Sequence, residues 1–464
     1  MTALYYAFGA LALALGIGVS IALHEIGHLV PAKRFGVKVT QYMVGFGPTL
    51  WSRRRGETEY GIKAIPLGGY IRMIGMFPPK PGDDPRLVRA SSTGRMGLMV
   101  DSAVQARAER RTGMAEQARQ ASLEEIRPGD ETRVFFRLSA PRKVVVMLGG
   151  PVMNLVIAAV LIAVTTSGFG VLGSTTRIQT VSQCVLPATA PADQQCTATD
   201  PRAPAAEAGV RPGDRLVAFD GQPVGSWEQA RAAIRAAGGR TVRLTVQRDG
   251  QQVDLTATVP TTARPVIGDD GQPVLAADGT PRTEQVGFLG LSPLPGLVRR
   301  PLTEVPGVLG DGLVQTAGVI LRIPQKMVGV AQAAFGSGER DPNGPIGVVG
   351  VTRVAGEIAS SQDIAFVQGP RARISFLLSL LASLNLALFV FNLIPLLPLD
   401  GGHVAGALYE GARRTLARLR RRPDPGPTDV ARLLPIAYAV SSVLIVMSVL
   451  LVYADVVNPV RIGG

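Results

Sequence analysis

The chain has 464 residues, a formal net charge of +13 and a hydrophobic fraction of 46%. This length is enough for several domains, and the hydrophobic fraction is high for a soluble enzyme. A basic excess of this size is compatible with nucleic-acid binding, but no zinc-finger pattern or set of stacking aromatic residues accompanies it. We therefore expect no nucleic-acid partner, and membrane topology accounts better for the charge.

Four stretches of about twenty residues or more, each long enough to cross a bilayer core of roughly 30 Å as a helix, contain no charged residue. They are 1–23, 144–176, 374–399 and 433–454. The first lacks a basic start and a small-residue cleavage site, so we expect it to be retained rather than removed as a signal peptide. The sequence thus predicts a polytopic α-helical membrane protein with about four transmembrane helices, at 1–32, 143–170, 374–400 and 433–456.

Basic residues suggest how these helices are oriented. They are frequent in 33–142 and in the link 401–432, and alternation of four helices puts both segments on the same side of the membrane. The positive-inside rule makes that side the cytoplasm. The long segment between the second and third helices, about 177–373, is then extracytoplasmic, as are both termini.

The cytoplasmic segment 33–142 begins with a predicted β-hairpin at 37–72 that is associated with the membrane or re-enters it. Two strand-like runs flank a charged turn, and Gly45 and Gly47 interrupt the first run. The residues that follow are polar, with helical stretches around 100–123, which is typical of an amphipathic helix at a membrane surface or loosely packed against the protein.

The extracytoplasmic segment contains a predicted α/β module at 175–262. A Pro-Gly turn, a strand and an Asp-Gly turn follow one another in 205–224, a helix is predicted at 227–237, and a hairpin at 241–259. This order resembles a PDZ domain of the bacterial protease type, which binds extended peptides or chain ends by strand addition. The alternative is a small packing domain without a ligand. Residues 263–370 are predicted to be linker and amphipathic helices.

The chain contains two cysteines, Cys184 and Cys196, and both fall in the predicted extracytoplasmic segment. An even pair in an oxidising compartment predicts a disulfide. The alternative is two independent buried thiols. Because the intervening chain is short and rich in Pro and Ala, we expect its ends to close easily into a bridge.

Two of the three histidines lie in the motif HEIGH at 24–28, which ends the first apolar stretch. On a helix, His24 and His28 share one face about 6 Å apart along the axis, so both imidazoles can reach one zinc ion. The intervening Glu25 can deprotonate a water that the metal activates. Burial of three ionisable side chains at membrane depth is costly without a function. The motif therefore predicts a catalytic zinc site with one Zn²⁺ per chain.

A catalytic zinc requires a third protein ligand and one open position. Asp400 and His403, which is the third histidine, lie together at the end of the third apolar stretch. Alternation of the helices puts both at the level of His24, so the residues alone leave the choice between them open. A helix-end carboxylate that faces water is the alternative interpretation of Asp400.

These motifs resemble those of the site-2 protease family of intramembrane zinc metalloproteases, in particular its bacterial envelope-stress branch with a PDZ insert. The matching segments are HEIGH at 24–28, GFGP at 45–48, GGY at 68–70, GPVMN at 150–154 and NLIPLLPLDGG at 392–402. The resemblance implies that Asp400 is the third zinc ligand and that Glu25 is the catalytic base. It also implies that Asn154 and Asn392 help to seat the substrate, and that the strand with Gly45 and Gly47 pairs with it.

The same resemblance implies a function and a location. The protein would be a hydrolase of the bacterial inner membrane that cleaves transmembrane segments of single-pass proteins near the cytoplasmic side. Typical substrates would be anti-sigma factors already cut outside the cell, as in regulated intramembrane proteolysis. The expected partners are therefore these membrane proteins, membrane lipid, and peptide ends at the PDZ-like domain.

Two other functions fit part of the pattern. Intramembrane His, Glu and Asp also mark the pathways of ion or metal transporters, but no inverted repeat is visible, and four helices are few for a conduit. A membrane scaffold with a PDZ-like domain and a structural zinc is the other alternative. Structural zinc sites normally have four protein ligands and no free glutamate, which disfavours this function.

Overall fold

The computed structural model describes residues 2–77, 87–92, 123–125, 130, 132–186, 194–266, 274–276, 280–336, 340–341, 344–360, 369–428 and 433–460. The chain divides into two compact units. The first, here the helical unit, comprises Met1–Thr165, Pro301–Ala365 and Arg373–Gly464. The second, here the sheet unit, consists mainly of Thr166–Arg300. The helical stretch predicted around 100–123 lies outside the described residues, apart from its last position.

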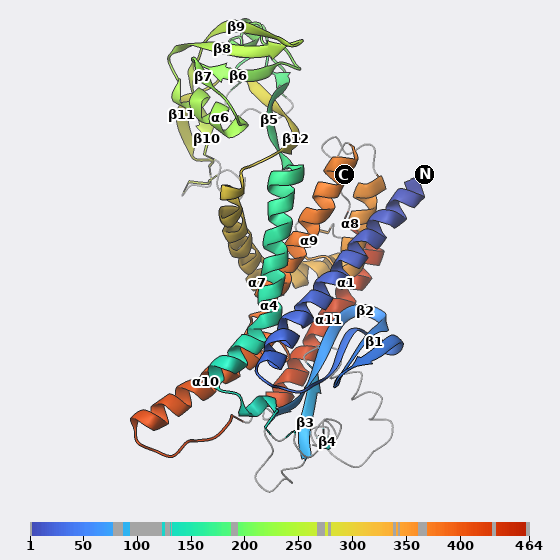
Figure 1. Ribbon diagram of the computed structural model, residues 1–464. Helices are drawn as coiled ribbons and strands as arrows, with labels where there is room; N and C mark the ends of the chain where they lie inside the picture. The colour runs from blue at the N-terminus through green and yellow to red at the C-terminus, as the bar shows by residue number, and fades with distance from the viewer. Residues whose placement is uncertain are drawn as a thin grey trace. The chain divides into compact units, whose positions relative to one another are not determined.

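Among the described residues, four helices are long and apolar enough to cross a membrane, as the sequence predicted (Figure 1). They are α1 (Thr2–Arg34), α4 (Ala140–Ala163), α9 (Pro370–Asn392) and α11 (Leu434–Val457). A π-helical segment, η2 (Val164–Phe169), follows α4 directly. Large apolar side chains such as Leu11, Val160 and Val446 are exposed on these helices, which is the surface expected of helices that face lipid.

The third apolar helix is shorter than the predicted span 374–400. After α9 the chain forms turns that contain Pro395 and Pro398, because proline has no N–H for the hydrogen bonds of a helix interior. A separate helix, α10 (Asp400–Leu419), then begins, although 401–432 was expected to be a loop. The many arginines of this segment suggested a solvated link, but they alternate with apolar residues at a helical period.

Two further helices belong to the helical unit. A single turn, η3 (Leu302–Glu304), leads into α7 (Val305–Phe335), and α8 (Val348–Ser360) follows. α8 packs on α1 through small residues: a Cβ atom on Gly9 would overlap the side chain of Ala359, and one on Gly356 would meet the ring of Tyr6. Close approach of helices at small residues is the usual packing mode in membranes.

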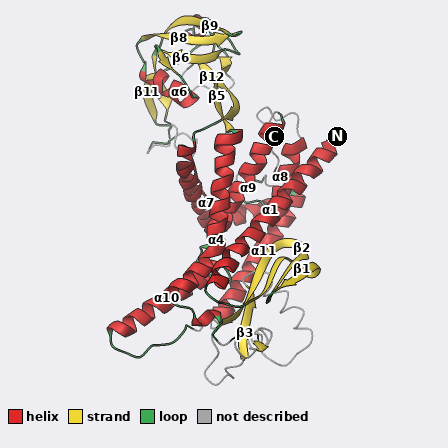
Figure 2. Cartoon of the chain, in the orientation of Figure 1, coloured by secondary structure: helices red, strands yellow, loops and turns green. Residues whose placement is uncertain are grey.

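A β-sheet lies against the end of α1 (Figures 1 and 2). Its strands β1 (Val39–Arg55), β2 (Thr58–Phe77), β3 (Leu87–Ser92) and β4 (Leu123–Glu125) are antiparallel and adjacent in chain order. Val39, Ile71 and Met73 of this sheet form a buried core with Val146 and Met147 of α4. Phe135 of η1 (Phe135–Arg137) contributes to the same core. The core therefore holds the β1–β2 hairpin beside α1 and α4.

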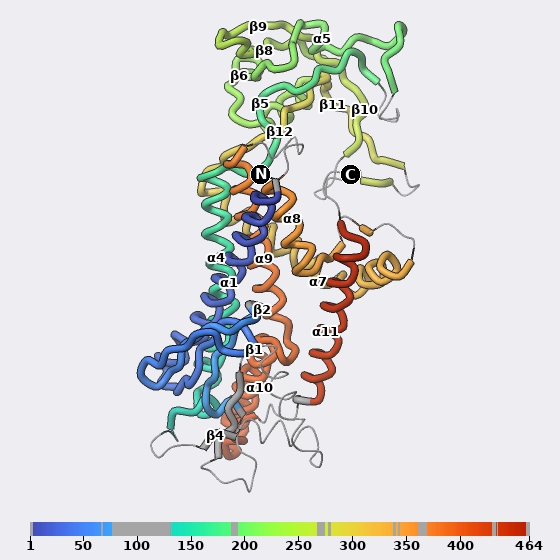
Figure 3. The backbone as a smooth tube through the Cα atoms, turned by 90° about the vertical axis from the view of Figure 1, so that its right-hand side faces the viewer, coloured from blue at the N-terminus to red at the C-terminus, as the bar shows by residue number. Residues whose placement is uncertain are grey.

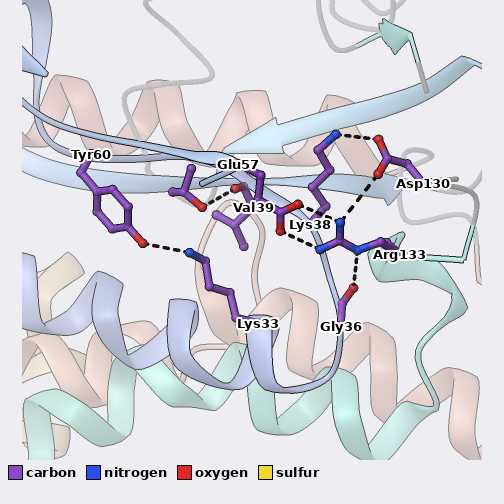
Figure 4. Close-up of polar contacts among 9 residues, drawn as sticks. Lys33, Gly36, Lys38, Val39, Glu57, Tyr60, Asp130 and Arg133 are labelled. Atoms are coloured by element: carbon purple, nitrogen blue, oxygen red, sulfur yellow. Dashed lines mark hydrogen bonds and ion pairs between the residues drawn. The ribbon is translucent and has the colours of Figure 1, made fainter. Parts of the chain in front are cut away.

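Polar contacts secure the same hairpin (Figure 4). The guanidinium of Arg133 donates two hydrogen bonds, of 2.7 and 2.6 Å, to the carboxylate of Glu57 in the hairpin turn. These bonds lower the pKa of the Glu57 carboxyl. Two further pairs belong to this cluster: Lys38 with Asp130, and Lys33 with Tyr60. The turn of the hairpin is thus tied to the end of α1 and to the chain that enters α4.

The sheet unit contains a larger sheet in the order β12-β5-β6-β8-β9, with the short β7 beside β6 and a separate ribbon of β10 and β11. Its elements are β5 (Val171–Val181), α5 (Pro204–Glu207), β6 (Arg215–Phe219), β7 (Gln222–Pro223), α6 (Trp227–Ala236), β8 (Thr241–Arg248), β9 (Gln251–Thr258), β10 (Thr261–Pro265), β11 (Thr283–Gly287) and β12 (Leu291–Val298). Ile178, Leu216 and Leu244 lie at the centre of its core, with Ala230 and Ile234 of α6.

This unit is larger than the module predicted at 175–262. β12 pairs antiparallel with β5, so part of the segment expected to be a linker forms an edge of the sheet. Pro293 and Pro295 made the segment look irregular. At an edge strand, however, a proline can face outward, where its missing N–H removes no hydrogen bond from the sheet.

The predicted disulfide is formed in the structure between Cys184 and Cys196, whose Cα atoms are 5.9 Å apart. Cys184 also pairs with Arg202 in an isolated β-bridge just after β5. The N–H of Ala203 donates to the carbonyl of Gln183 at 3.0 Å on the same side of this loop. The disulfide therefore joins the loop to the sheet next to the start of α5.

Candidate metal centre

The HEIGH motif lies in α1, and the helix brings its two histidines together as the spacing predicted. The Nε2 atoms of His24 and His28 are 3.3 Å apart, and the two rings are nearly perpendicular. His28 is completely buried, and Glu25 is 4% exposed. The side chains of His28 and Glu25 thus face the protein interior and not the apolar outer surface of α1.

Asp400, the first residue of α10, completes a group of three possible metal ligands. Its Oδ2 atom lies 3.4 Å from Nε2 of His24 and 3.5 Å from Nε2 of His28. Burial opposes ionisation of this carboxyl, but the two imidazoles outweigh it and hold the pKa of Asp400 below its usual value. Among the described residues, this group contains no other side chain, so His403 is not part of it.

The chain before α10 explains how Asp400 reaches the histidines. A Cβ atom on Gly401 would overlap the carbonyl of Ile394, and one on Gly402 would lie 2.6 Å from the backbone nitrogen of Leu397. The turns after α9 therefore fold tightly onto the first turn of α10, which only glycine permits. Any side chain at these two positions would push Asp400 away from α1.

A buried ion pair holds α10 against α4, and Figure 3 shows α10 below α9. Nζ of Lys143 lies 2.8 Å from Oε2 of Glu410, and the two side chains are 6% and 3% exposed. Arg414, one turn further along α10, lies 3.2 Å from the other carboxylate oxygen of Glu410. The first half of α10 is therefore fixed at its start by the tight glycine turns and at its end by the Lys143–Glu410 ion pair, and this keeps Asp400 in place.

Glycine also lets α4 approach the imidazoles. A Cβ atom on Gly150 would overlap Nε2 of His28 and lie 2.7 Å from Nε2 of His24. A Cβ atom on Gly149 would overlap the carbonyl of Gly27 in α1. The two helices thus touch through their backbones, and the lack of a side chain at Gly150 leaves room for both imidazoles.

The other nitrogen of each imidazole is held by α4. Nδ1 of His28 donates to the carbonyl of Val146 at 2.8 Å. Nδ1 of His24 lies 3.1 Å from the amide of Asn154, which is 1% exposed. A metal at Nε2 leaves the proton on Nδ1, so the Asn154 amide would then present its oxygen to this ring. Asn154, expected to contact substrate, contacts a histidine in the structure.

Glu25 faces the hairpin. A Cβ atom on Gly69 in β2 would lie 2.9 Å from Cγ of Glu25, so only glycine leaves room for the glutamate. The hydroxyl of Tyr42 in β1 donates to the carbonyl of Ala22 at 2.9 Å. Burial and the nearby charge of Glu25 raise the pKa of Tyr42 to about 12, so this hydroxyl stays protonated.

The remaining predicted site residues lie outside the ligand group. Gly45 and Gly47 belong to β1, with φ angles of 94° and 82° that favour glycine. A Cβ atom on Gly45 would lie 2.7 Å from the carbonyl oxygen of Ile65 in the paired strand. Asn392 is the last residue of α9 and is half-buried.

Sequence reasoning missed a polar contact between two of the apolar helices. Nδ2 of Asn385 in α9 donates to Oγ of Ser20 in α1 at 3.0 Å, and Asn385 is fully buried. Ser20 precedes His24 by one helical turn, so this contact fixes α9 beside the motif. The contact could have been predicted from an asparagine in an apolar stretch, because such a side chain needs a hydrogen-bond partner within the membrane.

Comparisons with known proteins agree with these features. The sequence model of Peptidase family M50 matches residues 12–422, a range that includes all three possible ligands. The zinc metalloprotease Rip1 of Mycobacterium tuberculosis is 34% identical over 465 residues, which cover 98% of each chain. Rip1 of Mycolicibacterium smegmatis is 34% identical over 472 residues, with 98% of this chain and 99% of that protein covered.

A more distant relative also matches over most of its length. The zinc metalloprotease RasP of Geobacillus kaustophilus is 25% identical over 435 residues, which cover 85% of this chain and 88% of that protein. The family match extends from the middle of α1 to just beyond α10 and therefore spans both units. This chain belongs to peptidase family M50, the site-2 protease family that its motifs resemble.

Proposed function

We propose that this member of the M50 family is a zinc endopeptidase that cleaves the transmembrane segments of single-pass membrane proteins. The observation that carries the proposal is the buried group of His24, His28 and Asp400 beside Glu25, within a bundle of helices apolar enough to span a membrane. We take its substrates to be anti-sigma factors that another protease has already trimmed outside the cell. Cleavage would then serve signalling by regulated intramembrane proteolysis.

The three side chains fit one zinc ion. Two imidazole nitrogens and one carboxylate oxygen form a donor set typical of catalytic zinc, with a fourth position left open. The space that a Cβ atom on Gly150 would fill lies at the two Nε2 atoms, where an ion would be held. Bound there, zinc supplies Lewis acidity toward a water molecule and the scissile carbonyl.

The residues around this site would carry out the proton transfers. The carboxylate of Glu25 takes a proton from the attacking water and later delivers it to the nitrogen of the leaving amine. The carbonyl of Val146 and the amide of Asn154 keep both imidazoles in the ring orientation and tautomer that ligation requires. The burial of Glu25 restricts access of bulk water to this base.

The hairpin is suited to receive an unwound substrate. A transmembrane helix must open locally to expose a peptide bond, and the freed backbone groups need new partners in lipid. β1 lies at the edge of its sheet and can pair with an extended chain. Its bulges at Gly45 and Gly47 would set where that pairing begins, and Asn392 at the end of α9 remains a proposed substrate contact.

We infer that the protein lies in the inner membrane of a bacterium with both termini and the sheet unit outside the cytoplasm. The basic residues of 33–142 and of α10 support a cytoplasmic position for these segments. The disulfide supports a position of the sheet unit in an oxidising compartment. Tags inserted at about 85 and 423 should be protected from an external reagent, and a tag at about 270 should be accessible.

We also propose that the sheet unit is a PDZ-like domain that binds peptide ends. Support comes from its edge strand β12, which has one neighbour, β5, among the described strands. A cavity of about 300 Å³ lies beside this strand, between α6 and residues 286–293. An edge strand next to a helix provides backbone pairing on one side and side-chain contacts on the other.

Substitution of the base tests the catalytic proposal. Glu25→Gln keeps the shape of the side chain but removes its basicity at neutral pH. In purified protein reconstituted with a single-pass membrane substrate, cleavage should fall by orders of magnitude, while zinc content stays near that of wild type. Wild-type cleavage by Glu25→Gln would refute this mechanism.

A further inference from the structure

The second half of α10 extends away from the other helices of its unit (Figure 1). The chain enters α10 from α9, which ends at Asn392, and later enters α11 at Leu434. Both neighbours are apolar enough to span a membrane, so the end of the first and the start of the second lie at the same membrane surface. Because only a short turn segment separates α10 from α9, the helix begins next to that surface.

One side of α10 is covered by protein. Glu410 lies on this side, and its carboxylate is paired with Lys143 of α4. The loop after the helix folds back to the same carboxylate, since the N–H of Thr428 donates to Oε2 of Glu410 at 3.2 Å. Nη2 of Arg413 donates to the carbonyl of Gly426 in this loop at 2.7 Å. The loop and α4 together therefore cover the Glu410 side of the helix.

The opposite side of α10 carries exposed apolar side chains. At a helical period of about 3.6 residues, positions 408, 409, 412, 416 and 419 share one side of the helix, with Ala412 opposite Glu410. We call these five positions the apolar stripe. Four of its side chains are large, and their exposed fractions are 59% for Leu408, 60% for Tyr409, 46% for Leu416 and 78% for Leu419. The described part of the chain thus leaves the stripe uncovered.

Arginines without acidic partners lie beside the stripe at the end of the helix. Arg414 is already paired with Glu410 and Asp424. Four further arginines are exposed, and none of them forms an ion pair with a described residue: Arg418, Arg420, Arg421 and Arg422. Long arginine side chains can lie along an apolar surface while their guanidinium groups stay at a polar boundary. The end of α10 therefore combines an apolar stripe with uncompensated positive charge.

This combination matches a bilayer surface better than a protein or a nucleic acid. An interfacial helix buries its apolar side at the level of the headgroups, and its arginines contact the phosphates of anionic lipids. A nucleic acid would satisfy the arginines but leave Leu416 and Leu419 in water. A second copy of the helix would cover the stripe but bring the arginines close to like charges. The adjacent membrane surface suits both the stripe and the arginines.

We propose that the second half of α10 docks on the membrane surface, with the apolar stripe among the lipids and the four arginines on the headgroups of anionic phospholipids. The proposal rests on α9 and α11 as membrane spans and does not involve the metal centre. An arginine at an anionic surface strengthens attachment about fivefold. Four of them make the attachment depend on the charge of the lipid.

Lipid contact is measured on the full-length protein in nanodiscs. The two native cysteines form a disulfide, so Leu416→Cys introduces the one thiol that a fluorophore can label. Arg418→Cys is the matched control, because this exposed residue lies on nearly the opposite side of the helix. Lipids with brominated acyl chains quench a fluorophore that touches them. We expect quenching at 416 to be about threefold stronger than at 418.

The role of charge is tested with the same label at 416. Quenching should fall by about half or more when discs that contain phosphatidylglycerol are replaced by discs of phosphatidylcholine alone. The triple variant Arg420→Gln, Arg421→Gln, Arg422→Gln should lose most of this difference between the discs. The control variant Arg53→Gln, Arg54→Gln, Arg55→Gln makes the same change of charge in β1 and should retain the difference.

Equal quenching at 416 and 418 would overturn the proposal, because the stripe would then not face lipid. Equal quenching at 416 in both kinds of disc would exclude a preference for anionic lipid and would overturn it as well. Protection of the label at 416 in discs that hold two copies would show that a second copy covers the stripe instead. None of these measurements uses cleavage, so their failure would leave the protease proposal unaffected.

Discussion

In the helical unit, α1 and α4 meet backbone to backbone at Gly27 and Gly149, and the imidazoles of the motif fit against Gly150. In the sheet unit, α6 instead rests on the core through the side chains of Ala230 and Ile234. The metal centre therefore depends on the absence of side chains, whereas the cavity beside β12 is shaped by the side chains that line it. The first arrangement tolerates almost no added volume.

Addition of one methyl group at the metal centre should have the largest effect. Gly150→Ala places a Cβ atom against both Nε2 atoms, so the two imidazoles can no longer converge on an ion. Zinc content, measured by mass spectrometry of the purified protein, should be lost, and cleavage should fall by orders of magnitude. The matched control is Gly18→Ala in α1, because a Cβ atom there meets open space. Full zinc content in Gly150→Ala would show that the helices are not held in backbone contact.

Removal of the carboxylate ligand should come next. Asp400→Ala leaves two donors, so zinc affinity and cleavage should both fall strongly. His403→Ala should keep both, since His403 lies outside the ligand group. Loss of metal in His403→Ala and its retention in Asp400→Ala would show instead that His403 is the third zinc ligand and that Asp400 is not.

Loss of the amide that orients His24 should be intermediate. Asn154→Ala removes a buried contact at 3.1 Å but no ligand, so we expect zinc affinity to fall about 10- to 100-fold. Metal affinity is measured by competition with a chelator, and KM for the membrane substrate is measured separately. A raised KM with unchanged zinc affinity would instead support the substrate contact that the family resemblance implied.

The smallest effect concerns stability of the sheet unit. Burial opposes ionisation of Asp214, but hydrogen bonds from Arg248 and the N–H of Arg211 hold its pKa below the usual value. A lowered pKa stabilises the fold above the pKa of the unfolded state, roughly 3.9, and this contribution disappears as pH falls through the folded value.

Thermal unfolding followed from pH 6 to pH 3 tests this expectation. Wild type should lose stability of the sheet unit below about pH 4. Asp214→Asn should be less stable at neutral pH by about 1–3 kcal/mol and should lose less on acidification. Equal slopes for the two proteins would show that Asp214 does not carry this part of the pH dependence.

The sequence allowed prediction of those features that depend on local pattern. The spacing of His24 and His28 needs only a helix, and long uncharged stretches predict apolar helices whatever they pack against. The disulfide followed from two cysteines in a segment expected outside the cytoplasm. The choice of Asp400 over His403 was open from the residues alone, and the geometry now favours Asp400.

Features that depend on contacts between distant segments could not be predicted. The role of Gly150 is visible only when α4 lies against α1, and the pairing of β12 with β5 joins residues far apart in the chain. The start of α10 at Asp400 was obscured because apolar composition continues across the turns after α9, although the two prolines mark its end. Tertiary contacts outweighed local composition at each of these places.

The donors of the metal centre come from α1 and α10, and the hairpin, α4 and the sheet unit lie between these two helices in the chain. Neither helix alone offers more than two of them. During translation, the hairpin and the sheet unit are therefore made before α10. The three donors can meet only after α10 has left the ribosome. An unfinished or truncated chain that already spans the membrane carries Glu25 without a complete binding site. Because of the wide separation of the donors in the chain, a complete site can form only after α10 has been made.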